Sequence, residues 1–265
     1  MTTQPLTGKV ALVTASSRYT GSVIAAALAR AGAKTAIHYN SSRDKAEALA
    51  QKLRAEGLEA STFGADGQQP GELQRMADEI IQRYGAVDIL VNNLGPYADT
   101  PFLKLPEAQW DWILNTNLKA AYVLVQKLVP GMIQRGWGRV INISAASAFI
   151  RSHSIYGLAK AALIYLTEAL AVELAPYVTV NAIAPGQIED SELIDEIDPN
   201  YKRILREESP LKRLVMRQEI ADMILLLCVG PFASVTGQTI RMDAGWTVPT
   251  WEYHVGAVEW KESSS

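Results

Sequence analysis

Short runs of apolar and β-branched residues alternate along most of the chain with longer segments in which apolar residues recur every three or four positions. The short runs predict strands at residues 9–14, 33–39, 87–93, 138–144, 177–185 and 238–243. The longer segments predict helices, most clearly at residues 43–57, 70–85 and 155–174. Such alternation is typical of βαβ units, so we expect an α/β fold with a doubly wound parallel sheet. Ligands of such sheets bind beyond the carboxyl ends of the strands.

Composition and charge narrow the class of protein. The chain has 265 residues, of which 48% are hydrophobic, so residues 1–265 can bury a core as a single domain. The net charge of -3 is spread along the chain with both signs interspersed, which gives no basic surface for nucleic acid. The composition therefore favours small-molecule chemistry and no nucleic-acid partner.

Cysteine usage and hydropathy point to a cytoplasmic protein. Cys228, the only cysteine, lies in the apolar run MILLLCVG and is interpreted as a core residue. The amino terminus lacks the apolar segment of a secretory signal, and no uncharged stretch approaches the ~18 residues that span a membrane. The histidines have no metal-ligand spacing, so we expect neither a metal ion nor a membrane partner.

The segment YGLAK holds the strongest candidate for acid–base chemistry. Tyr156 and Lys160 are four residues apart in a helical pattern, so both side chains project from one face. A neighbouring ammonium group stabilises a phenolate and lowers the pKa of the tyrosine hydroxyl. We therefore expect Tyr156 to act as a general acid near neutral pH.

Six segments together resemble the short-chain dehydrogenase/reductase family over nearly the whole chain. They are VDILVNNLG (87–95), ILNTN (113–117), INIS (141–144), the Y-x-x-x-K of residues 156–160, APGQI (184–188) and TGQTIRMDAGW (236–246). The resemblance implies a Rossmann-type sheet of about seven strands, a nicotinamide cofactor, and hydride exchange with a carbonyl or alcohol. It further implies that Tyr156 donates and accepts the proton and that Lys160 lowers its pKa and holds the nicotinamide ribose. Asn117 would keep a water in the proton relay.

The serine that holds the substrate oxygen in this family is less clearly matched. Counting from the strand places Ala145 in the serine position, and counting back from Tyr156 places Ile143 there. Neither residue has a hydroxyl group. Ser144 is the best candidate and Ser147 the next, although an ordinary serine at a strand end is an equally good interpretation.

The nucleotide-binding turn also departs from the family. The pattern T-G-x-x-x-G-x-G becomes Thr14 to Gly21, with Ala15 and Tyr19 in two glycine positions. Glycine permits positive φ and close approach to a pyrophosphate, so these residues alter the turn. The helix that follows still offers unpaired N–H groups, and Ser16, Ser17 and Thr20 add hydroxyl groups.

Two groups of proteins related to this family carry a similar replacement in the turn, and they differ in function. An aromatic residue in the glycine position resembles the halohydrin dehalogenases, lyases that bind a halide in place of nicotinamide and carry arginine where this chain has Lys160. The pteridine reductases replace the same glycine and still bind NADPH. A lyase without nicotinamide and a non-catalytic binding protein therefore remain as alternatives to a reductase.

The turn after the second strand favours NADP(H) over NAD(H). A basic residue in this turn accommodates a 2′-phosphate, whereas NAD-dependent enzymes place an acidic residue there. Ser41, Ser42 and Arg43 occupy the turn, and Arg18 could reach the same phosphate; a helix cap is the competing interpretation. The remaining cofactor contacts implied by the resemblance are Thr14, Ser16, Gly21, Asp66, Asn92, Leu94, Gly95, Pro185, Gly186 and Ile188.

Two further segments complete the expectations. Residues 187–213, acidic first and basic later, correspond to the substrate lid of the family, although such a charge run is also typical of a solvated helix face. Residues 247–265 form a carboxyl-terminal tail that we expect either to cross to a neighbouring subunit or to pack on its own. The resemblance implies a homo-oligomer, a dimer or tetramer, built through the helices that carry Asn117 and Tyr156. The residues expected to wall a pocket for a small carbonyl or alcohol substrate are Tyr97, Phe149, Ile150, His153, Leu193 and Trp246.

Overall fold

The protein is described here from a computed structural model, which defines residues 4–150, 154–191 and 200–248. The expected positions of His153, Leu193 and most of the tail lie outside these residues. The strands are β1 (Val10–Val13), β2 (Lys34–Tyr39), β3 (Ala60–Gly64), β4 (Ile89–Asn92), β5 (Gly138–Ile143), β6 (Val178–Pro185) and β7 (Thr239–Met242). The α-helices are α1 (Tyr19–Arg30), α2 (Arg43–Ala55), α3 (Pro70–Tyr84), α4 (Glu107–Leu114), α5 (Ala120–Gln134), α6 (Ile155–Glu173), α8 (Tyr201–Glu208) and α9 (Arg217–Cys228).

The strands form one parallel sheet in the order β3-β2-β1-β4-β5-β6-β7. This order confirms the expected α/β, doubly wound, Rossmann-type sheet of seven strands. The chain runs from β1 toward one edge and then returns through β4 toward the other. Since β1 pairs with both β2 and β4, the order reverses beside β1, where such sheets bind their ligands.

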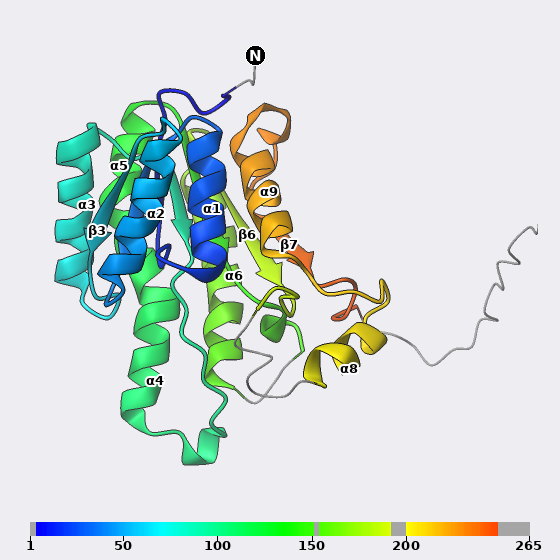
Figure 1. Ribbon diagram of the computed structural model, residues 1–265. Coiled ribbons are helices and arrows are strands. Elements are labelled where there is room, and N and C mark those ends of the chain that lie inside the picture. The colour runs from blue at the N-terminus through cyan, green and yellow to red at the C-terminus, as the bar shows by residue number, and fades with distance from the viewer. Residues whose placement is uncertain (1–3, 151–153, 192–199, 249–265) are drawn as a thin grey trace, which may run out of the picture.

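Two apolar layers cover the sheet, one on each face. Helices α1, α2 and α9 bury their small and branched side chains on one face, and Figure 1 shows them side by side in front of the strands. Helices α3, α5 and α6 contribute to the core on the opposite face. Because both faces are covered, the strands are nearly continuous apolar runs; β1, for example, is VALV and fully buried.

Helix α6 combines length with low polarity. It is the one helix among the described residues that is long and apolar enough to cross a membrane by composition. Its buried residues Ala159, Leu163 and Thr167 follow the i, i+4 spacing of a single face, which lies against the sheet. The hydropathy of α6 is therefore that of a core helix.

Helices α4 and α8 lie beyond the carboxyl ends of the strands, at the lower edge of the view in Figure 1. They come from different connections, one after β4 and the other after β6. The two connections leave the same edge because parallel strands share one direction. This edge holds the residues expected to form the site.

Candidate active site

The turn between β1 and α1 keeps a glycine-like backbone without the glycines. Ala15 has φ 49° and Tyr19 has φ 52°, both in the left-handed region that non-glycine residues rarely adopt. Gly21 is retained where packing demands it, since a Cβ there would lie 2.2 Å from the Ala15 carbonyl oxygen. The backbone path expected for a pyrophosphate-binding turn is thus present, at the cost of two strained residues.

Two guanidinium groups flank the ring of Tyr19. The Arg18 Cζ lies 4.8 Å and the Arg217 Cζ 5.5 Å from the ring centroid. Helix α1 begins at Tyr19, and no side-chain hydrogen bond caps its start. Positive charge and helix N–H groups therefore gather at this turn, which suits a phosphate group.

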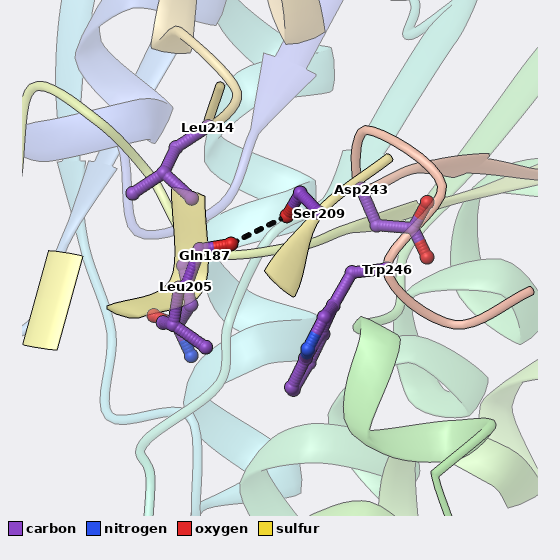
Figure 2. A pocket seen from close by; sticks show the side chains of 6 residues that line it. All are labelled: Gln187, Leu205, Ser209, Leu214, Asp243 and Trp246. Carbon is purple, nitrogen blue, oxygen red and sulfur yellow. Dashed lines mark hydrogen bonds between the residues drawn. The ribbon is translucent and has the colours of Figure 1, made fainter. Parts of the chain in front are cut away.

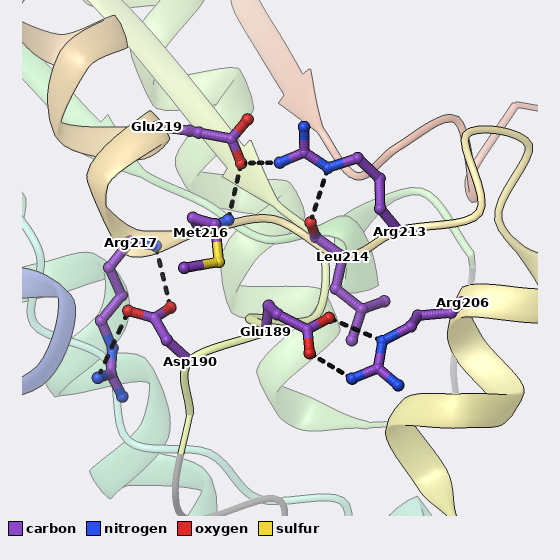
Figure 3. A network of polar contacts seen from close by, with 8 residues as sticks. All are labelled: Glu189, Asp190, Arg206, Arg213, Leu214, Met216, Arg217 and Glu219. Atoms are coloured by element: carbon purple, nitrogen blue, oxygen red, sulfur yellow. Dashed lines mark hydrogen bonds and ion pairs between the residues drawn. The ribbon is translucent and has the colours of Figure 1, made fainter.

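Sequence reasoning missed Arg217 because it stands almost two hundred residues away from the turn it faces. Its backbone N–H donates to Asp190 Oδ1 at 3.1 Å, and its Nη1 lies 3.9 Å from Asp190 Oδ2. Figure 3 shows the Asp190 carboxylate directed at the start of α9. The acidic group of Asp190 is thus engaged by Arg217.

The hydroxyl groups of Thr14 and Ser16 are used inside the protein. Thr14 Oγ1 accepts from the backbone N–H groups of Asn93 and Leu94 at 2.8 and 3.1 Å, so it ties β1 to the end of β4. Ser16 Oγ donates to the Val13 carbonyl at 2.6 Å. Both side chains are fully buried. Thr14 and Ser16 thus shape the turn from within, and their contact with a cofactor stays a prediction.

The turn after β2 presents its polar groups to solvent. Ser41 and Arg43 are exposed, and the Ser42 side chain makes no hydrogen bond to the first turn of α2. The helix-cap interpretation of Ser42 is thus not the one observed. Asp66, just after β3, accepts from the Gln68 N–H at 3.0 Å and keeps a partly exposed side chain.

Four residues from three elements converge below the strand ends. A Cβ on Gly95 would lie 2.7 Å from Asn117 Oδ1 and 2.8 Å from Lys160 Nζ, so both groups meet over this glycine. Lys160 Nζ also lies 5.5 Å from the centroid of the Tyr156 ring. Tyr156 and Lys160 are carried by α6, and Asn117 by the π-helical turn η2 (Asn115–Lys119) that precedes α5.

Asn117 has one oxygen without a protein partner. Its Nδ2 donates to the Pro96 and Ile113 carbonyls at 3.1 and 3.0 Å, whereas Oδ1 is buried and accepts no hydrogen bond from the described residues. A buried acceptor of this kind calls for a water or a ligand donor. The orphaned oxygen beside Lys160 fits the water-holding role that the resemblance implied.

The pKa values of the pair differ from the expectation. Burial, followed by the nearby Tyr97 whose ring centroid lies 5.2 Å away, raises the pKa of the Tyr156 hydroxyl. Burial lowers the pKa of the Lys160 ammonium to about 7, although its Nζ donates to the Ile143 carbonyl at 2.8 Å. The expected lowering of the Tyr156 pKa is therefore not found, because burial disfavours the charged phenolate. Tyr156 keeps its proton at neutral pH.

Ser144 follows β5 and is directed into the protein. Its Oγ donates to the Lys160 carbonyl at 2.9 Å, and the residue is 2% exposed. Ala145, the residue in the serine position counted from the strand, is also buried. The hydroxyl of Ser144 thus fixes α6 against β5, and its role toward a substrate oxygen stays a prediction.

The other expected cofactor residues line the carboxyl edge of the sheet. Asn92 Nδ2 donates to Asn142 Oδ1 at 2.8 Å, which joins β4 to β5. Leu94 contacts the turn at Gly67, where an added Cβ would come 3.1 Å from its side chain. Pro185 ends β6, and a Cβ on Gly186 would lie 2.9 Å from the Asp243 Cα, so the chain is closely packed there.

The connection after β6 is anchored on both sides. Ile188 forms an isolated bridge with Val215, and Arg206 of α8 pairs with Glu189 through its Nε at 2.9 Å. Figure 3 shows this pair beside the Asp190–Arg217 and Arg213–Glu219 pairs. These three pairs tie the described part of residues 187–213 to its own helix α8 and to α9, and its role as a substrate lid stays a prediction.

A cavity of about 10 Å³ lies beside this connection and is about the size of one water molecule. Figure 2 shows Trp246 and Asp243 on one side of it, and Leu205 of α8 with Ser209, the residue after α8, on another. Trp246, expected in the pocket wall, donates through Nε1 to Glu208 at 3.3 Å. The full set of lining residues is Gln187, Leu205, Ser209, Leu214, Asp243 and Trp246.

Comparisons with known proteins identify the family of the chain. A family model described as "Enoyl-(Acyl carrier protein) reductase" matches residues 15–247. The 3-oxoacyl-(acyl-carrier-protein) reductase of Staphylococcus epidermidis is 35% identical over 240 residues, which make up 89% of this chain and 98% of the relative. The chain therefore belongs to the short-chain dehydrogenase/reductase family of oxidoreductases.

Solved structures share the overall fold. A gluconate 5-dehydrogenase from Burkholderia cenocepacia, in complex with NADP and tartrate, is similar with a TM-score of 0.86 and 30% identity, covering 93% of this chain and 98% of its own. A blue fluorescent protein from a metagenomic library, in complex with NADPH, has a TM-score of 0.82 and 31% identity, covering 91% of this chain and 99% of its own. Both relatives were thus solved with an NADP-type cofactor.

Gly95→Ala should lower turnover without preventing the protein from folding. The added Cβ would push against the ends of two flexible side chains, Asn117 and Lys160, and not against backbone. We expect a folded protein whose reductase turnover falls roughly 100-fold, because small displacements of reacting groups are costly. Steady-state kinetics with thermal unfolding measure both quantities. Gly71→Ala, where a Cβ meets nothing within 4 Å, is the control and should leave turnover unchanged.

Lys160 should make stability depend on pH. Its pKa is about 7 in the folded protein and near the ordinary value of 10.5 in the unfolded chain. Between these values the unfolded chain binds more protons, so the free energy of unfolding rises with pH by up to about 1.4 kcal/mol per unit. Denaturant unfolding from pH 7 to about 9.5 measures this slope. Lys160→Met should flatten it, and parallel curves for the two proteins would contradict the assignment.

Proposed function

We propose that this protein is an NADP(H)-dependent reductase that transfers a hydride between the nicotinamide and a small carbonyl or alcohol substrate. The observation that carries the proposal is the convergence of Tyr156, Lys160 and Asn117 around Gly95 at the reversal of strand order. Family membership and the cofactors of the two solved relatives support it.

The residues present fit a nicotinamide dinucleotide. The turn at Ala15 to Gly21 follows a glycine-like path, and the uncapped start of α1 with Arg18 and Arg217 offers positive charge to the diphosphate. We assign Asp66, just after β3, to the adenine side of the cofactor. The absence of a side chain at Gly95 brings the orphaned oxygen of Asn117 next to Lys160, where the two groups would hold a water and the nicotinamide ribose. When bound, the cofactor supplies the hydride.

Side chains of the protein donate and accept the proton that the reaction requires. In the direction of reduction, Tyr156 holds its proton at neutral pH, since burial raises its pKa, and donates it to the substrate oxygen. Lys160 and the water held by Asn117 return a proton to the phenolate. Lys160, with a pKa of about 7, is able to gain or lose a proton under these conditions. In the direction of oxidation the same groups accept the proton.

NADP(H) is favoured over NAD(H) by the turn after β2. Arg43 is exposed at the start of α2, and Ser41 and Ser42 precede it with hydroxyl groups that do not cap the helix. An arginine and two hydroxyls suit a 2′-phosphate. The nearby acidic residue, Asp44, comes one position inside the helix.

We also propose a homo-oligomer formed through α5 and α6, in a cytoplasmic protein. An apolar groove runs between these helices, and Tyr122, Tyr165 and Val172 are exposed by 47%, 75% and 83% along them. Exposed apolar surface of this extent is typical of a protein interface. The residues lining the groove are Leu114, Asn115, Leu118, Lys119, Tyr122, Ala162, Tyr165, Leu166 and Ala169.

Tyr156→Phe tests the proposed chemistry. The variant should lose nearly all turnover, roughly 10²-fold or more, while its NADPH affinity stays within a few fold, because the proton is needed only in the reaction. Nicotinamide fluorescence on titration with NADPH gives the affinity, and consumption of NADPH with a panel of small ketones gives the rate. A wild-type protein that binds neither NADPH nor NADH at millimolar concentration would refute the proposed function.

Arg43→Asp tests the cofactor preference. The new carboxylate should repel the 2′-phosphate and weaken NADPH binding by roughly tenfold or more, with little effect on NADH. Lys45→Asp is a matched control, since Lys45 is exposed in the same helical turn and the charge change is equal. Equal losses for both cofactors, or equal losses in both variants, would show that Arg43 does not read the phosphate.

A further inference from the structure

One buried histidine connects β2 to the nucleotide-binding turn. His38 lies near the carboxyl end of β2 and is 0% exposed. It faces the turn after β1 on one side and the end of β3 on the other. Neither the chemistry of Tyr156 nor the lid involves this residue.

His38 makes four hydrogen bonds to the turn and to β3. Its Nδ1 accepts from the Ala15 N–H at 2.8 Å, and its Nε2 lies 3.0 Å from the Ala65 carbonyl oxygen. Its backbone N–H donates to Ser16 Oγ at 2.9 Å, and its carbonyl accepts from the Ser16 N–H at 2.9 Å. Two consecutive residues of the turn are thereby fixed by this single strand residue.

The hydrogen-bond partners of His38 determine the protonation state of its imidazole ring. A backbone N–H can only donate, so Nδ1 carries no proton, and a carbonyl can only accept, so Nε2 carries one. The ring is therefore neutral. Burial lowers the pKa of His38, against the opposing field of Asp66, and this agrees with the neutral form.

The turn needs such a partner because its first glycine position holds Ala15. At φ 49°, Ala15 adopts a left-handed conformation that is unfavourable for any residue with a Cβ. Its N–H points inward, where only the His38 ring satisfies it among the described residues. Without an acceptor there, the alanine would relax toward negative φ and change the path of the turn.

We propose that His38 is a positioning residue that holds the turn at Ala15 and Ser16 in its cofactor-binding form. The inference rests on the proposed dinucleotide binding, which it deepens. In this arrangement the acceptor on β2 compensates for the conformational freedom that a glycine would have supplied at position 15.

Two polar substitutions of His38 distinguish the hydrogen bond made by Nδ1 from the one made by Nε2. In His38→Asn the amide oxygen stands near the position of Nδ1 and can still accept from Ala15, but cannot reach Ala65. In His38→Gln the longer amide reaches toward Ala65 and leaves Ala15 without its acceptor. We expect His38→Asn to bind NADPH within about threefold of the wild type, and His38→Gln to bind it roughly tenfold or more weakly.

Hydrogen–deuterium exchange gives a second readout that needs no cofactor. In the wild type and His38→Asn, the peptide covering residues 11–18 should stay protected, and in His38→Gln the Ala15 amide should exchange roughly tenfold faster or more. Thr35→Val is the control for a general loss of stability, since Thr35 is a fully buried polar residue of the same strand whose hydroxyl bonds the Ala33 carbonyl. It should leave both cofactor affinity and exchange of this peptide unchanged.

The outcomes distinguish the two proposals. If the wild type binds NADPH and His38→Gln binds it equally well, the positioning role is wrong and the proposed function stands. If the wild type binds neither NADPH nor NADH, the proposed function fails, and the exchange of Ala15 still decides whether His38 holds the turn. Unchanged exchange in His38→Gln would overturn the inference in either case.

Discussion

The parallel pairing of β1 with both β2 and β4 is the constraint on which the rest of the structure depends. Parallel strands require crossovers, so every strand enters from one edge of the sheet and ends at the other. The reversal of strand order beside β1 then leaves a place at the carboxyl edge that no crossover helix covers. The turn at Ala15, Gly95 and the end of β6 all lie at this carboxyl edge, although they are far apart in the sequence.

At this edge, buried polar groups divide into those that build the site and those left for a ligand. The hydroxyl groups of Thr14, Ser16 and Ser144 form hydrogen bonds with backbone groups. These bonds fix the turn and the first half of α6. Asn117 keeps one buried oxygen without a protein partner, beside a lysine whose charge is destabilised by burial. Polar groups that are already satisfied give rigidity, and the unsatisfied ones mark where a ligand or water belongs.

The fold could be predicted from the sequence because it depends on periodicity, which survives divergence. Residues 138–144 and 177–185, for example, were recognisable as strands and appear as β5 and β6. The site was predictable only as a set of residues, since side-chain direction depends on neighbours that the pattern does not reveal. The hydroxyl of Ser16 turns inward because His38 stands beside it, and Arg217 reaches Tyr19 from a distant helix. The direction of the Tyr156 pKa depends on burial, which spacing along a helix does not report.

The ion pairs that anchor the connection after β6 differ in kind from the contacts that hold the sheet. Arg206 and Glu189 keep 40% and 30% of their side chains exposed, and Arg213 and Glu219 keep 51% and 39%. Dissolved salt screens exposed charges over about 8 Å at physiological ionic strength, whereas apolar burial in the sheet is scarcely affected by it. Ionic strength therefore acts on this connection separately from the sheet: added salt weakens the pairs that anchor the connection and leaves the buried apolar contacts of the sheet in place.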